Sequence, residues 1–280
     1  MSNIYLAKLN INERIHDVYK EEVQLRELLI QLFNDIDEDK VIINETTEVK
    51  YKIVDIEKDP DEFTIKGRFI RIYKTIDQDF YDPNKDELTQ KELENSAEYV
   101  AFTFYVLREI IAFVPKQKFT RQQFLERFTD FIEKCSPNIG KINLQIRYDK
   151  EALEEKYKKI ATLREISVVI VPPNGDKDLW KGLESIGEEL EETEAKKMSF
   201  SLFGTIRKPL NKSSDLVKGF KQFVKSGYGD MKATGRDANE NPVEIDTLKD
   251  EKLVERHKIH QSLKDSPSEI ENQIKERNIL

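Results

Sequence analysis

Two apolar segments near the middle of the chain constrain its fold more than any other feature. Residues 100–107 and 110–114 are rich in β-branched and aromatic side chains, and only Arg108 and Glu109 separate them. This spacing predicts a β-hairpin, although the turn lacks the glycine or asparagine that such short turns usually contain. We expect this hairpin at the centre of a sheet, with a helix covering one face.

A helix is predicted directly after the hairpin. Thr120 is the expected N-cap, and Gln123, three residues later, completes a capping box. The apolar side chains that follow recur at helical spacing and share one face: Phe124, Leu125, Phe128, Phe131 and Ile132. Cys135, the only cysteine, lies on the same side, so we expect a buried thiol rather than a disulfide.

Apolar periodicity predicts the elements of the N-terminal half. Strands are expected over residues 4–11, 49–56 and 63–74, and a helix over 15–36. Residues 75–95 are acidic and poor in apolar side chains, so we expect a mobile surface loop or an internal linker there.

The C-terminal half is predicted to alternate strands and helices. The expected strands cover 141–147, 166–171, 229–236 and 242–247, the last two forming a hairpin. Three helices are expected, opened by Asp149, by Asp176 or Asp178, and by Ser213 or Ser214. Beyond these elements the chain is mostly charged, and a capping box from Ser266 to Glu269 predicts a short final helix.

These elements predict an α+β, or mixed α/β, fold with mixed, largely antiparallel sheets built from β-hairpins and covered by helices. We expect three parts: a mixed α/β region over 1–175 that holds the central hairpin, an α+β region over 176–250, and a charged tail over 251–280 that ends in the short helix.

Composition places the chain among heavily charged globular proteins. Hydrophobic residues make up 38% and charged residues 36%, and no apolar run approaches the ~20 residues of a membrane-spanning helix. The first residues do not form a secretion signal, so we expect a cytoplasmic protein. The net charge of −8 argues against nucleic-acid binding over the whole surface, but a local basic patch stays possible.

One segment, 205–236, reverses the charge of the chain. It holds eight basic residues against Asp215 and Asp230, a local +6 that leaves −14 for the rest. The basic residues are Arg207, Lys208, Lys212, Lys218, Lys221, Lys225, Lys232 and Arg236. Three of them, Lys218, Lys221 and Lys225, recur on one face of the predicted helix, an arrangement that suits contacts with phosphate. An ordinary solvated helix face is the alternative interpretation.

A second basic set surrounds the start of the central helix, where anions are favoured. It comprises Lys116, Lys118, Arg121 and Arg127 and could extend a phosphate track. Arg108, in the hairpin turn, is close in sequence and is expected to be a surface charge.

Motifs of catalysis and metal binding are not recognisable in the sequence. His257 and His260 form an H-x-x-H pair, but His16 and Cys135 are the only further His or Cys side chains that could complete a zinc site. Glu48 and Lys50, after Asp35, are similar to a nuclease carboxylate and lysine set, a spacing that chance produces about nine times in so charged a chain. We therefore expect no metal, no cofactor and a non-catalytic protein.

The order of these segments is similar to that of a known group. The strand 4–11, the hairpin ending Ile110-Ile-Ala-Phe-Val-Pro, the strand 166–171 with Pro-Pro-Asn after it, and the hairpin 229–237 occur at the same spacing in an uncharacterised bacterial family of similar length. The outline resembles the RexA-type phage-exclusion family and, more loosely, the B component of the Kiwa defence system. The resemblance covers most of residues 1–250.

The resemblance implies an intracellular antiphage sensor that is dimeric, binds duplex DNA without sequence preference and signals to a partner, expected to be a membrane effector. Two other interpretations stay open: a nuclease or other phosphodiester-cleaving effector, and a protein–protein adaptor using the acidic face at 188–194. We also expect a homodimer, since two copies of the basic segment would form one basic channel. The C-terminal helix with Ile270 and Ile274 is a candidate for part of the dimer contact.

Overall fold

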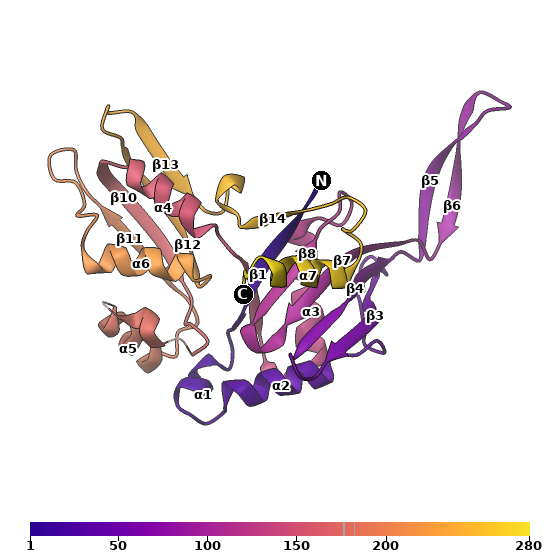
Figure 1. The fold of residues 1–280 in the computed structure, drawn as a ribbon, viewed down its shortest axis with the longest axis horizontal. Helices are drawn as coiled ribbons and strands as arrows, with labels where there is room; N and C mark the ends of the chain where they lie inside the picture. The colour runs from indigo at the N-terminus through magenta and orange to yellow at the C-terminus, as the bar shows by residue number, and fades with distance from the viewer. Residues whose placement is uncertain (176, 182) are drawn as a thin grey trace.

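Two antiparallel sheets, each covered by helices, divide the molecule into two lobes (Figure 1). The computed structural model describes residues 1–175, 177–181 and 183–280. The first lobe is built on an eight-stranded sheet and the second on a four-stranded sheet. The predicted α+β class, with largely antiparallel sheets and covering helices, is confirmed. Among the described residues, no helix has the length and apolar character needed to cross a bilayer.

The first sheet has the strand order β14-β1-β8-β7-β4-β3-β2, and β9 also pairs with β1. Its strands are β1 (Ser2–Ile11), β2 (Val41–Ile43), β3 (Lys50–Asp59), β4 (Thr64–Ile72), β7 (Ala97–Tyr105), β8 (Ile110–Val114), β9 (Ile142–Ile146) and β14 (Arg256–Ile259). The predicted central hairpin is confirmed as β7 and β8. Its turn, η1 (Val106–Arg108), leaves Glu109 at φ 58°, a left-handed conformation that glycine adopts more readily.

One face of this sheet packs against α2 (Leu25–Asp35) and α3 (Arg121–Cys135). The predicted capping box of α3 is present, with Thr120 and Gln123 each accepting a hydrogen bond from the other's backbone N–H. Successive α3 residues place aromatic rings against the sheet, and Phe128 lies 5.1 Å from Phe69 and 4.9 Å from Phe102 between ring centroids. The single helix predicted over 15–36 is instead two, α1 (Ile15–Tyr19) and α2.

The opposite face of the first sheet is covered by the C-terminal helix, α7 (Pro267–Glu276). Ile270 and Ile274 are completely buried in this second apolar layer, and β14 extends the sheet beside β1. The expectation that Ile270 and Ile274 form a dimer contact is therefore wrong, because the chain itself covers them.

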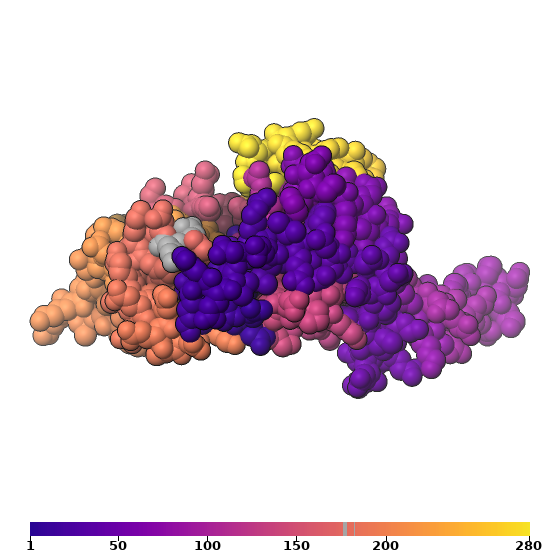
Figure 2. Space-filling model, turned by 90° about the horizontal axis from the view of Figure 1, so that it is seen from below, coloured from indigo at the N-terminus to yellow at the C-terminus, as the bar shows by residue number. Residues whose placement is uncertain are grey.

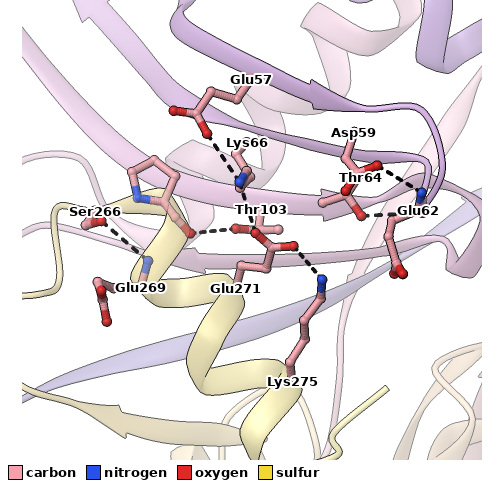
Figure 3. Close-up of polar contacts among 11 residues, drawn as sticks. Glu57, Asp59, Glu62, Thr64, Lys66, Thr103, Ser266, Glu269, Glu271 and Lys275 are labelled. Atoms are coloured by element: carbon pink, nitrogen blue, oxygen red, sulfur yellow. Dashed lines mark hydrogen bonds and ion pairs between the residues drawn. The ribbon is translucent and has the colours of Figure 1, made fainter.

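Polar contacts fix α7 in this position (Figure 3). The Thr103 hydroxyl donates to Pro267 O at 3.0 Å, and the Glu271 carboxylate lies 3.1 Å from Lys66 Nζ and 2.9 Å from Lys275 Nζ. Burial raises the pKa of Glu271, but the two ammonium groups lower it by more, so the pKa stays below its ordinary value.

A two-stranded arm leaves the body between β4 and β7. Its strands, β5 (Thr75–Asp82) and β6 (Glu87–Glu94), form a separate sheet that projects from the first lobe in both views (Figures 1 and 2). The predicted mobile loop over 75–95 is therefore wrong. The acidic residues that suggested a loop lie on a regular ribbon, and Pro83 lies in its turn rather than within a strand.

The second lobe has the antiparallel strand order β11-β10-β12-β13. Its strands are β10 (Thr162–Ile170), β11 (Met198–Phe203), β12 (Gly229–Arg236) and β13 (Pro242–Asp246). Its helices are α4 (Lys150–Lys159), α5 (Glu184–Glu192) and α6 (Asp215–Lys225). The short turns η3 (Lys177–Trp180) and η4 (Glu251–Leu253) also contribute to its core, whereas η2 (Pro137–Ile139) contributes to the core of the first lobe. The predicted late hairpin is confirmed as β12 and β13.

The core of the second lobe begins at Tyr148 and includes β10. Residues 148–170 therefore pack with the second lobe, although we predicted them in the same region as the central hairpin. Asp178 lies in η3, and α5 begins later, at Glu184. Asp176, the other predicted start of that helix, lies outside the described residues.

Candidate nucleic-acid interface

Three of the eight predicted phosphate-binding residues gather where α4 packs beside α6. Lys221 Nζ lies 2.9 Å from a carboxylate oxygen of Glu154, and Lys225 forms an ion pair with the same oxygen. Hydrogen bonds from Lys225 and Lys221 lower the pKa of Glu154 to about 2. Glu154 is therefore ionised at neutral pH and neutralises part of this basic face.

Lys212 belongs to the same group but has a structural role. Its ammonium group donates to Tyr157 O at 3.2 Å and to Ile160 O, and lies 4.9 Å from the centroid of the Tyr157 ring. Burial lowers the pKa of Lys212. A cation at this position satisfies carbonyl groups at the end of α4.

The other five predicted residues are more exposed and separately placed. Lys218 pairs with Asp215 at 3.6 Å, Lys232 with Glu244 at 3.4 Å, and Arg236 with Glu240 at 3.0 Å. Arg207 and Lys208 are exposed in the loop after β11. The ion pairs thus divide the basic segment into local groups.

The second predicted basic set is also divided by ion pairs. Lys116 binds Asp265 at 2.8 Å, Arg121 binds Glu251 at 2.7 Å, and Arg127 binds Asp130 at 3.0 Å, while Lys118 is exposed. Three of these four cations are therefore neutralised by acidic side chains of the same chain.

Basic side chains from both lobes line a cleft of about 640 Å³ between them. The charged residues of this cleft, among those the structure describes, are Lys8, Arg108, Glu109, Arg147, Lys150 and Lys225. Lys8 lies on β1, Arg108 and Glu109 in the central turn, Lys150 at the start of α4 and Lys225 at the end of α6. We call this group of residues the basic cleft. Among the described residues, its charged side chains are these five cations and the one acidic side chain of Glu109.

Three of the five cations have acidic partners. Lys8 Nζ lies 2.5 Å from the Glu109 carboxylate, Arg147 lies 3.0 Å from Glu255, and Lys225 pairs with Glu154. Arg108 and Lys150 are exposed, and neither has an ion pair within the described part of the chain. These two side chains therefore supply the unneutralised charge of the cleft.

A buried polar group forms the base of the cleft and joins the two lobes. The Asn174 amide accepts a hydrogen bond from Ile11 N–H at 2.8 Å and donates to Leu9 O at 2.7 Å, so it pairs with β1 as another strand would. Glu109 lies beside it, and burial raises the pKa of Glu109 although Lys8 and Asn174 lower it in part. A buried carboxylate in a left-handed backbone conformation is costly and is maintained by its surroundings.

Sequence reasoning did not find this cleft. Lys8, Arg147 and Lys150 come from separate segments with no local excess of positive charge, and Arg108 is predicted only as a surface charge close in sequence to the second basic set. The only local signal of an unusual site was the central turn, where Glu109 has the left-handed backbone conformation that glycine adopts more readily.

A second cavity, of about 450 Å³, is lined in part by the half-buried Asp230. Its carboxylate accepts a hydrogen bond from Tyr148 OH at 2.5 Å and another from Gln145 Nε2 at 2.7 Å. Burial raises the pKa of Asp230 and that of Tyr148. Asp230, one of the two acidic residues of the basic segment, therefore bonds to Tyr148 and Gln145 rather than to a basic residue of that segment.

The three histidines lie apart, and each contacts a different hydrogen-bond partner. His16 Nε2 lies 3.0 Å from Ala195 O, His257 Nε2 lies 3.2 Å from Glu255, and His260 Nδ1 lies 2.8 Å from the Ser262 hydroxyl. Within the described residues, no group of three metal-ligating side chains occurs.

The remaining residues considered for chemistry also have local partners. Glu48 pairs with Lys74 at 2.8 Å, and Asp35 accepts a hydrogen bond from Ser136. Burial raises the pKa of the Cys135 thiol to about 12, so this side chain behaves as a small apolar group.

Comparison with known protein families gives a match over almost the whole chain. The family model described as "Domain of unknown function (DUF4747)" matches residues 2–276. No curated protein matches the chain.

Proposed function

The chain belongs to the DUF4747 family, whose description states no function, and we propose from the geometry of the basic cleft that it binds duplex DNA without sequence specificity. The main support is that five cations from both lobes line one cleft. Two of them, Arg108 and Lys150, have no acidic partner within the described residues. Cations on long side chains contact phosphate groups, which are the same in every sequence.

We further propose that the protein acts in the cytoplasm as an antiphage sensor that signals to a partner effector. Support for this role comes from the resemblance of its element order to the RexA-type phage-exclusion family. The two-lobed arrangement suits a sensor, since a ligand held between the lobes contacts both of them.

The test is a DNA-binding titration at several salt concentrations. For wild type we expect similar affinity for unrelated duplexes of equal length. For the Arg108→Ala/Lys150→Ala variant we expect the slope of log affinity against log salt to fall by about 1.8, since each phosphate contact contributes about 0.9. Fluorescence anisotropy with a labelled duplex measures this slope.

A matched control removes two other lysines. Lys40 and Lys134 are exposed, do not line the basic cleft and have no ion pair within the described residues. We expect the Lys40→Ala/Lys134→Ala variant, which has the same net charge as the cleft variant, to keep the wild-type slope. Equal slopes for the two variants would contradict the assignment of binding to the cleft.

A further inference from the structure

One face of the arm formed by β5 and β6 carries acidic side chains that have no basic partners in the described part of the chain. Asp77 lies directly opposite Glu92, and Thr75 lies opposite Glu94. Side chains two residues apart on a strand share a face, so Asp77, Asp79, Glu92 and Glu94 point to the same side. All four are exposed and have no ion pair within the described chain. Like charges directly opposite one another destabilise a strand pair.

The same face of the arm ends in two exposed apolar side chains. Tyr81 lies opposite Leu88, and they are 60% and 74% exposed. The ribbon forms a sheet of its own, and two-stranded ribbons are marginally stable in water unless another surface covers them. The arm face therefore presents carboxylates near its base and apolar groups near its tip.

The basic cleft has the complementary pattern. Its exposed cations are Arg108 and Lys150, and its lining also includes the apolar side chains of Leu107, Ile110 and Ile279. The arm carries a net charge of −5 over residues 75–94, whereas the charged side chains lining the cleft, among the described residues, sum to +4. The charges and the apolar groups of the two surfaces thus match in kind.

We propose that the arm of one copy docks in the basic cleft of a second copy, and that exchange of arms forms a two-fold homodimer. In Figure 1 the arm points away from the second lobe and therefore from its own cleft. Eight residues in each strand give the arm a length of about 26 Å, enough to reach a neighbouring molecule. The contact is closed, because each copy gives one arm and receives one.

Arm docking and nucleic-acid binding use the same cleft and therefore compete. This second part rests on the proposed function, whereas arm docking itself does not. The four carboxylates of the arm face would form ion pairs with the cleft cations that otherwise contact phosphate. DNA that enters the cleft displaces the arm and converts dimer to DNA-bound protein.

The first experiment neutralises the arm face. Analytical ultracentrifugation of the Asp77→Asn/Asp79→Asn/Glu92→Gln/Glu94→Gln variant is expected to show a dimer dissociation constant raised by about tenfold or more. A wild-type protein that is monomeric at all concentrations tested, or a variant that dimerises as wild type does, would overturn the proposal.

A matched control neutralises four exposed carboxylates on α5. The Glu188→Gln/Glu189→Gln/Glu191→Gln/Glu192→Gln variant has the same net charge as the arm variant. We expect its dimer dissociation constant to stay within about twofold of wild type, since a change of net charge alone acts weakly at physiological salt. Equal weakening in both variants would show a general charge effect and overturn arm docking.

The second experiment reverses the charge of one surface at a time. We expect the Asp77→Lys/Asp79→Lys/Glu92→Lys/Glu94→Lys variant, whose arm carries +3, to be monomeric, because a positive arm then faces a positive cleft. We expect the Arg108→Glu/Lys150→Glu variant to be monomeric as well, because its two exposed cleft cations become carboxylates that face the negative arm. Mixed together they should form a heterodimer, since both contacts regain opposite signs. A mixture that stays monomeric contradicts the proposal, while each variant's circular dichroism checks that it is folded.

DNA titration of the same proteins separates the two proposals. The arm-neutral variant is expected to bind duplex DNA at least as tightly as wild type, because a competitor is lost. If charge reversal in the cleft abolishes dimerisation but leaves DNA affinity unchanged, the proposed DNA binding fails and arm docking holds. If the same charge reversal abolishes DNA affinity but leaves the dimer intact, arm docking fails and the proposed DNA binding holds.

Discussion

Glu154 lies on α4, outside the basic segment, yet it forms ion pairs with two lysines on α6. Lys221 and Lys225 both contact its carboxylate, and only Lys225 also lines the basic cleft. An alanine variant of Lys218, Lys221 and Lys225 would therefore remove fewer free charges than the sequence suggests. Removal of the glutamate should have the opposite effect on DNA binding.

We expect Glu154→Gln to bind duplex DNA more tightly, with a salt slope steeper by about 0.9 as Lys225 becomes free to contact phosphate. Glu155, the exposed neighbour on α4, provides the matched control as Glu155→Gln. An affinity that falls in the Glu154 variant would show that the ion pairs position the helix for binding rather than compete with it.

The same residue predicts a pH dependence of stability. The pKa of Glu154 is about 2 in the folded protein against an ordinary value of 4.5, so the folded state favours the ionised form. Its stabilising contribution is therefore complete above pH 4.5 and is lost as the pH falls towards 2. Urea unfolding of wild type and Glu154→Gln should differ above pH 4.5 and converge near pH 2. A constant difference over this range would contradict the pKa assignment.

The sequence predicted part of the basic face on α6. The helical spacing of Lys221 and Lys225 was correct, and Lys212 joins them through Tyr157. Their acidic partner is about seventy positions away, at Glu154, and no local pattern identifies such a pair. Side-chain neutralisation depends on tertiary contacts, so charge counting along the chain overestimates free charge.

Among the elements, α3 is the one whose sequence signals agree most closely with its structure. The capping box marks the start of the helix, and the apolar residues recur on the face that is buried. Phe128 on this face is completely buried among Phe69, Phe102 and Phe124. Local and tertiary preferences coincide here, which makes an element predictable.

We expect Phe128→Ala to lower the free energy of unfolding by about 3–5 kcal/mol, because the ring leaves a cavity that the surrounding aromatic groups fill only in part. Denaturant unfolding measures the loss. Phe203→Ala, at an exposed aromatic residue at the end of β11, should change stability by no more than about 0.5 kcal/mol. Equal stability of wild type and the Phe128 variant would contradict the packing described for α3.

Two other elements were less predictable, each for a physical reason. In the arm, apolar side chains such as Ile76 and Phe80 alternate with acidic residues, as in a strand. The acidic composition nevertheless predicted a loop, because apolar side chains are few there. In α7, the periodicity was recognised, but its partners Ile4 and Tyr105 belong to strands far away in the chain. Helix formation is a local property, whereas the surface that a helix covers is not.

A few buried polar contacts join the two lobes. Asn174 pairs with the backbone of β1, Asn10 Nδ2 donates to Gly227 O at 3.1 Å, and Tyr19 OH donates to Pro173 O at 2.7 Å. These contacts fix the width of the basic cleft because they lie between the sheets.

We expect Asn174→Ala to cost about 2–4 kcal/mol, since it leaves Ile11 N–H and Leu9 O buried without a partner. Hydrogen exchange should become faster at the Ile11 amide. The Asn84→Ala control changes an exposed residue in the arm turn and should leave both stability and exchange unchanged. Wild-type exchange at Ile11 in the Asn174 variant would show that this contact does not hold the lobes together.

The pairing of β1 with β14 has a consequence for how the protein is made. Residues 2–11 leave the ribosome roughly 250 positions before residues 256–259, and synthesis proceeds at about 5–20 residues per second. For on the order of tens of seconds, residues 2–5 of β1 and the apolar layer beneath α7 therefore await partners that have not been translated. The first lobe is completed last, although most of its strands are made first, and the pace of translation through the second lobe sets how long a nascent chain stays open to aggregation and to chaperones.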